Sequence, residues 1–221
     1  PTREGVANFH DNFVDALILA GEEKIAEGKV EQAVTLYKKA FTYPENHQVF
    51  LVDERATHDA QINYCLGEAY AALGQDAEAE KYWKLAAEQD YELKGSKDFR
   101  YWTGLALERL GRKAEAEAIF SALVADGEAA VVTQHVNFYG AEGTTGVTVD
   151  IINSAAYYTQ ALGHLGLGHR GKAKRLFAPR DINVPTEVVV HEAEQQRPVT
   201  QLLDTGIIEV GLRSVAALHA H

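Results

Sequence analysis

The sequence predicts an all-α protein built from about four helix-turn-helix units, and three observations carry this prediction. An eleven-residue phrase, LGQDAEAEKYW at 73–83, returns as LGRKAEAEAIF at 110–120, and EGKVEQAVTLY at 27–37 and LGHRGKAKRLF at 167–177 are weaker copies. Each copy places an Ala five residues after a Gly and an aromatic residue four further on. An apolar stripe with helical spacing precedes the turn.

Each copy predicts the end of one helix, a short turn and the start of another. The Gly ends the first helix because it enters the left-handed C-cap conformation freely. The Ala and the aromatic residue are one helical turn apart, so they share a face of the second helix. The four triplets are Gly28, Ala33 and Tyr37; Gly74, Ala79 and Trp83; Gly111, Ala116 and Phe120; and Gly168, Ala173 and Phe177.

Two further glycines, Gly67 and Gly104, fall inside the predicted first helices. A glycine in a helix interior costs about 1 kcal/mol relative to Ala. We therefore expect each of them to admit the next helix closely, opposite small residues such as Ala79 and Ala116.

The spacing of the units predicts insertions between them. The turn glycines at 28, 74, 111 and 168 are 46, 37 and 57 residues apart. The extra residues fall at 42–55, 91–96 and 131–153. The last insertion contains Gly140, Gly143 and Gly146 between β-branched runs, which predicts an extended loop with room for a short hairpin.

After Pro185 the repeated pattern is lost, so we predict a helical repeat domain at 1–185 and a separate segment at 186–221. This segment would cap the last unit, whose apolar face has to be covered. Docking onto a second copy of the chain, giving a homodimer, is the alternative. Its apolar stripe is Leu202, Leu203, Ile207, Ile208, Leu212 and Val215.

Composition excludes several classes of protein. A net charge of -11 without a cluster of Lys and Arg argues against a nucleic-acid partner. No run approaches the roughly 18 apolar residues of a membrane span, so we expect no membrane partner. The N-terminal PTREGVANFHDNF lacks the features of a secretory signal, and Cys65 is the single cysteine. We therefore expect a cytoplasmic protein without a disulfide.

Catalytic and metal-binding signatures are missing from the sequence. There is no GxSxG elbow, P-loop, HExxH or CxxC. His164 and His169 straddle the last turn, but the sequence places no third metal ligand beside them. Cys65 falls among core positions and is expected to be a small buried apolar residue. We predict no catalytic residues, no cofactor and no metal site.

The pattern resembles the tetratricopeptide repeat, a helix-turn-helix unit of about 34 residues. The resemblance covers roughly residues 10–185 and implies a right-handed α-solenoid. The fourth unit departs from the family pattern, with Ala161 at the small position of its first helix and His164 at the usual aromatic position. The second unit carries the fullest match, at Leu66, Gly67, Tyr70, Gly74, Ala79, Trp83 and Ala86.

The resemblance also implies a concave groove lined by the first helix of each unit. The second, fifth, ninth, twelfth and thirteenth positions of that helix would point into the groove. Tyr recurs at the fifth position of the last three units. The groove candidates are Tyr64, Glu68, Tyr101, Leu105, Arg109, Tyr158 and Leu162.

The tyrosines have two possible roles at this point, because a Tyr side chain suits both contact with a ligand and packing between neighbouring helices. One subgroup of the family clamps the C-terminal carboxylate of chaperones with Lys and Asn. Tyr occupies that Lys position here, and Glu or Leu the Asn position, which argues against this ligand. The stripe of Tyr over Glu and Leu suits an apolar or aromatic peptide, an internal loop, or a sugar face stacked on aromatic rings. We therefore expect a non-enzymatic scaffold that binds a protein or peptide partner.

A narrower resemblance gives the alternative function. AFTYPENHQ at 40–48 and ATHDAQINYCLGEAYAALGQDAEAEKYW at 56–83 are similar to the C-terminal repeat region of large bacterial proteins. The N-terminal part of those proteins is an uncharacterised β-rich domain, expected to be carbohydrate-active. The chain would then be an accessory module of a carbohydrate-active enzyme. The segment after Pro185 departs from that family's usual ending.

Overall fold

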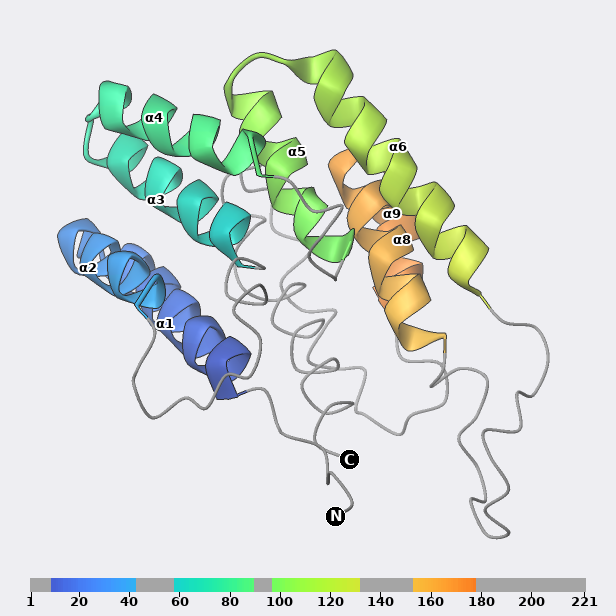
Figure 1. Ribbon diagram of the computed structural model, residues 1–221, viewed down its shortest axis with the longest axis horizontal. Helices are drawn as coiled ribbons and strands as arrows, with labels where there is room; N and C mark the ends of the chain where they lie inside the picture. Colours follow the sequence, from blue (N-terminus) through green and yellow to red (C-terminus); the bar gives the residue numbers. More distant parts are fainter. Residues whose placement is uncertain (1–8, 43–57, 90–96, 132–152, 178–221) are drawn as a thin grey trace, which may run out of the picture. The chain divides into compact units, whose positions relative to one another are not determined.

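The computed structural model describes residues 9–42, 58–89, 97–131 and 153–177 (Figure 1). Within these four segments all regular secondary structure is helical, which confirms the predicted all-α class for this part of the chain. The 131–153 insertion apart from its two end residues, and the whole 186–221 segment with its apolar stripe, lie outside the described residues.

The described helices form pairs joined by short turns. The pairs follow the positions of the repeated phrase, with one short 3₁₀ helix, η2, directly before α5. In chain order the elements are α1 (Phe9–Ala26), α2 (Val30–Ala40), α3 (Asp59–Ala72), α4 (Asp76–Ala87), η2 (Lys97–Phe99), α5 (Arg100–Arg109), α6 (Lys113–Ala130), α8 (Ser154–Gly166) and α9 (Arg170–Phe177).

The chain divides into two compact units, and α6 runs across the boundary between Ile119 and Phe120. In the first unit each helix from α1 to α4 packs against the next. In addition α1 contacts α3, and α3 contacts α5. In the second unit α8 packs against α9.

The four turns share one backbone conformation. Gly28, Gly74, Gly111 and Gly168 have φ of 74°, 70°, 76° and 74°. After Gly74, the Gln75 N–H donates to the Tyr70 carbonyl at 2.9 Å, which closes the helix in the Schellman manner. The predicted left-handed C-cap glycines are therefore confirmed. The corresponding bonds run from Lys29 to Lys24, Arg112 to Leu107 and His169 to His164, at 2.8, 2.9 and 2.8 Å.

Gly67 makes room for an aromatic ring of the next helix, which the sequence did not predict. A Cβ at Gly67 would overlap the indole of Trp83, and one at Gly21 would overlap the ring of Tyr37. In these first two pairs of helices, the aromatic residue of the second helix lies over the glycine of the first. A flat ring buries far more area in that space than an Ala side chain would.

The core of the first unit lies between α1, α2, α3 and α4. Ile18, Ala33, Leu66 and Ala79 are at most 1% exposed and belong to one cluster of buried residues. Cys65 belongs to the same cluster, as the sequence predicts. On the other side of α4, Thr103 of α5 donates a buried hydrogen bond to the Ala86 carbonyl at 3.1 Å.

In the second compact unit, α6 and α8 are in close contact at glycines that the repeat pattern does not single out. A Cβ at Gly163 would meet the Phe120 carbonyl oxygen, and one at Gly127 would meet the Ala156 carbonyl oxygen. A Cβ at Gly166 would overlap the ring of Phe120. These small residues let the two backbones approach each other directly.

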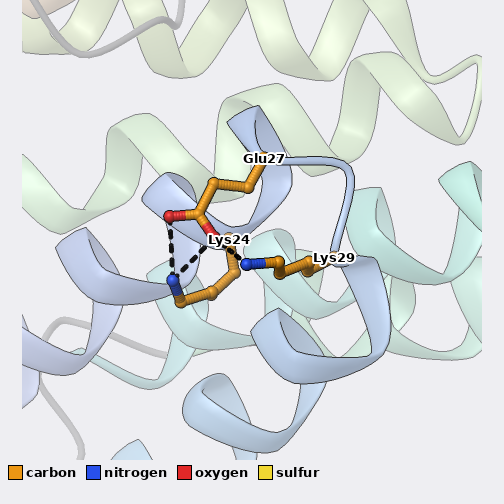
Figure 2. A network of polar contacts seen from close by, with 3 residues as sticks. All are labelled: Lys24, Glu27 and Lys29. Atoms are coloured by element: carbon orange, nitrogen blue, oxygen red, sulfur yellow. Dashed lines mark hydrogen bonds and ion pairs between the residues drawn. The ribbon is translucent and has the colours of Figure 1, made fainter.

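An exposed ion network lies at the first turn (Figure 2). Lys24 Nζ donates to both carboxylate oxygens of Glu27, at 2.9 and 2.8 Å, and Lys29 Nζ donates to Glu27 Oε2 at 2.7 Å. Hydrogen bonds from Lys24, and then from Lys29, lower the pKa of Glu27 to about 2. Lys24 and Lys29 are the same two residues whose backbone groups close the helix around Gly28.

We expect Gly74→Ala to lower the free energy of unfolding by about 1–2 kcal/mol, because an L-residue at a φ of 70° is strained. A Cβ there meets no other atom, so the cost comes from the backbone alone. Gly171→Ala in α9 is the matched control, since it also enters open space but in a helix. It should be neutral or slightly stabilising in urea unfolding. Equal losses from the two substitutions would contradict the prediction.

We expect carboxyl NMR to give Glu27 a pKa of about 2, against an ordinary value of about 4.3. The pKa of Glu27 is lower in the folded state than in the unfolded state. Any stabilisation from the network is therefore present above the unfolded-state pKa and is lost as the pH falls toward 2. Lys29→Met should raise this pKa, and added salt should do the same. Lys39→Met, in the last turn of α2, is the control and should leave it unchanged.

Candidate functional site

The structure brings three of the seven predicted groove residues together in the first unit. Tyr64 and Glu68 lie one turn apart on α3, and Arg109 ends α5. Tyr101 and Leu105 also lie on α5, at 2% and 9% exposure. Tyr158 and Leu162 lie on α8 in the second unit.

Glu68 is the centre of this group. Its Oε2 accepts a hydrogen bond from Arg109 Nη2 at 2.5 Å, and its Oε1 accepts one from Trp83 Nε1 at 3.1 Å. Tyr64 lies beside Arg109, whose charge and hydrogen bonding favour the ionised phenol. We call Glu68, Arg109, Trp83 and Tyr64 the Glu68 cluster.

The local fold explains why these residues meet. The helix α3 packs against both α4 and α5, so its side chains reach partners on both. Trp83 lies over Gly67, and its indole N–H therefore reaches the adjacent residue, Glu68. The sequence marked Trp83 as a packing residue only, and its hydrogen bond to Glu68 was not predicted.

The ion pair is partly shielded from solvent. The side chains of Arg109 and Glu68 are 34% and 27% exposed. Burial raises the pKa of the Glu68 carboxyl, while Arg109 and Trp83 oppose that rise. Burial also raises the pKa of the Tyr64 phenol above its ordinary value, so the ring stays neutral even in mildly alkaline solution. The cluster thus joins a charged pair at the surface to a neutral ring beneath it.

The tyrosine rings are packed against other aromatic residues. The Tyr64 and Tyr101 rings each lie 5.5 Å, centroid to centroid, from Trp102. Half-buried Tyr158 contacts Phe177 at 5.8 Å. Tyr64 and Tyr101 are therefore inside the helix packing, and ligand contact through them stays a prediction. Trp102 was missed, although the doublet at 101–102 in RYWTG was its signal.

A second polar contact that the sequence did not reveal lies around His58, at the start of α3. Its ring is 5% exposed, and Nδ1 lies 3.4 Å from Gln61 Oε1 and 3.8 Å from Asp15 Oδ1 of α1. The edge of the ring meets Phe99 of η2, with centroids 4.6 Å apart. His58 thus links three elements of the first unit.

Comparisons with protein-family models, curated proteins and solved structures find no match for this chain. In the described segments, no three His, Cys, Asp or Glu side chains gather as a metal-ligand group. None of the described helices is long and apolar enough to cross a bilayer. What the Glu68 cluster offers chemically is paired charge and hydrogen bonding over aromatic rings, which suits recognition of a polar partner group.

We expect Arg109→Met to lower the free energy of unfolding by about 1–2 kcal/mol at pH 7, because it leaves the Glu68 carboxylate partly buried without its cation. This range is below that of a fully buried pair since solvent screens both groups. Without Arg109 the pKa of Glu68 should rise further. A carboxyl whose pKa is higher in the folded state than in the unfolded state destabilises the fold as the pH rises above the unfolded-state pKa. The stability lost in Arg109→Met should therefore be smaller near pH 5 than at pH 7.

Urea unfolding at pH 5 and pH 7 measures both effects. Glu68→Gln should cost less, since its amide oxygen still accepts from Trp83. Arg112→Gln is the matched control, because it breaks an exposed pair with Glu115 at the start of α6 and should leave the free energy of unfolding nearly unchanged. A deficit in Arg109→Met that does not change with pH would contradict this account of Glu68.

Proposed function

We propose that this chain is a non-enzymatic interaction module of the tetratricopeptide-repeat kind, a right-handed solenoid of about four units. In this proposal it holds a peptide or protein partner along a surface formed by the first helices of its pairs. The described structure supports the proposal through its turns, its helix contacts and the Glu68 cluster.

The contacts among α1, α3 and α5 carry the proposal. These are the first helices of three successive helix pairs. All three lie in the first compact unit of the chain, where α1 contacts α3 and α3 contacts α5. Each second helix also packs on the first helix of the next pair, as α2 does on α3 and α4 on α5. Stacking of this kind lines up the first helices side by side, which is how helical repeats build a binding face.

The Glu68 cluster gives that face its recognition chemistry. A guanidinium carries five N–H donors in a planar fork, and Arg109 directs only part of that fork at Glu68. The remainder suits a carbonyl or carboxylate of an extended peptide, while Glu68 can accept a peptide N–H. Tyr64 and Trp102 behind the pair are buried and hold its two helices in place.

The chemistry of the described residues favours binding over catalysis. Cys65 is buried in the core, and burial raises the pKa of its thiol well above the ordinary value, which keeps it un-ionised. Glu78, Glu80 and Glu115 each pair with a Lys or Arg on their own helix or at its start. Helix-surface pairs of this kind are typical of a solvated exterior.

A peptide-display selection on the full chain tests the proposal. We expect the selected peptides to bind the native protein and to lose at least about tenfold in affinity on Arg109→Gln, equivalent to about 1.4 kcal/mol. Binding should weaken with salt, since the contact is charged and partly exposed.

Arg112→Gln is again the matched control, because it breaks an Arg–Glu pair of similar chemistry outside the Glu68 cluster. It should leave the affinity unchanged. Peptides that bind both variants equally would remove the Glu68 cluster from the proposal. A selection without peptides, combined with binding on an oligosaccharide array, would instead favour the accessory module of a carbohydrate-active enzyme.

A further inference from the structure

The fourth turn brings two histidines together in a way that the function above does not use. His164 lies in the last turn of α8, and His169 directly follows Gly168. Their Nδ1 atoms are 3.4 Å apart, and their ring centroids are 5.5 Å apart. Because the centroids are farther apart than the nitrogens, the Nδ1 edges of the rings face each other.

The turn itself produces this approach. The His169 N–H donates to the His164 carbonyl at 2.8 Å, which is the helix closure shared by all four turns. In the first turn the matching residues are Lys24 and Lys29, and their ammonium groups both bind the Glu27 carboxylate (Figure 2). In the first turn, the side chains at these two positions therefore converge on one group.

We propose that His164 and His169 form a two-histidine site for a divalent transition-metal ion that prefers tetrahedral coordination. Zinc is the ion that this geometry fits best. Zinc–nitrogen bonds of about 2.0–2.1 Å at the tetrahedral angle place two ligand nitrogens about 3.4 Å apart. A right-angle arrangement, as in square-planar copper or nickel sites, would bring them to about 2.9 Å. The observed nitrogen separation fits the tetrahedral case, and water would complete the coordination.

Two charged side chains lie near the pair of histidines, and they act on a bound cation in opposite directions. Lys172 repels a cation at this site and Glu128 attracts one. The sequence predicts no metal site because it places no third protein ligand beside these two histidines.

Zinc titration followed by NMR of the histidine ring nitrogens tests the site. The chain used should carry His219→Ala and His221→Ala, since this closely spaced terminal pair could bind zinc itself. We expect the Nδ1 resonances of His164 and His169 to shift together and to saturate at one ion per chain. Lowering the pH to about 5 should release the ion, as protons compete for the rings.

His169→Ala should weaken this binding at least tenfold, and His164→Ala should do the same. Lys172→Ala should strengthen it, because it removes a positive charge without removing a ligand. His169 is exposed, so its loss leaves the fold intact. Nδ1 resonances that do not respond to zinc, or equal affinity in His169→Ala, would overturn the proposal and leave a hydrogen bond between the two rings.

Discussion

The left-handed backbone at four glycines is the constraint on which the rest of the described structure depends. A φ near 70° is freely available only to glycine, and it lets the next residue bond back to the last turn of the helix. The chain reverses direction, and the second helix starts two residues after the glycine. The pairing of α1 with α2, of α3 with α4 and of α8 with α9 follows from this reversal, and so does the aromatic packing over Gly21 and Gly67.

The Trp83 indole connects this packing to the Glu68 cluster. It fills the space above Gly67 and donates to Glu68, so one side chain fixes both the α3–α4 contact and one carboxylate oxygen. The other oxygen faces Arg109 of α5. Glu68 thus joins three helices, and both of its carboxylate oxygens are held by hydrogen bonds. In the proposed interaction module, such preorganisation would reduce the ordering cost of binding.

The sequence could predict the turns and the helix class because both depend on local spacing. Gly74 and Trp83 lie within one repeated phrase. The turn at Gly74 and the helix face that carries Trp83 both follow from the residues next to them in the sequence. The contact between Glu68 and Arg109 spans 41 residues and depends on how α3 and α5 pack. Their repeat positions predicted that Glu68 and Arg109 lie on one face, but only the packing of the helices shows that they are in contact. The Gly163 contact with the Phe120 carbonyl was likewise invisible to repeat alignment.

The turns also show how one scaffold can carry different chemistry. The backbone bond that closes each turn uses only main-chain atoms, so the two side chains beside it are free to vary. They are Lys24 and Lys29 in the first turn and His164 and His169 in the fourth, giving an anion contact in one and facing imidazoles in the other. The second and third turns carry Tyr70 with Gln75 and Leu107 with Arg112. Because these substitutions leave the closure unchanged, the turn positions can acquire a ligand without altering the fold.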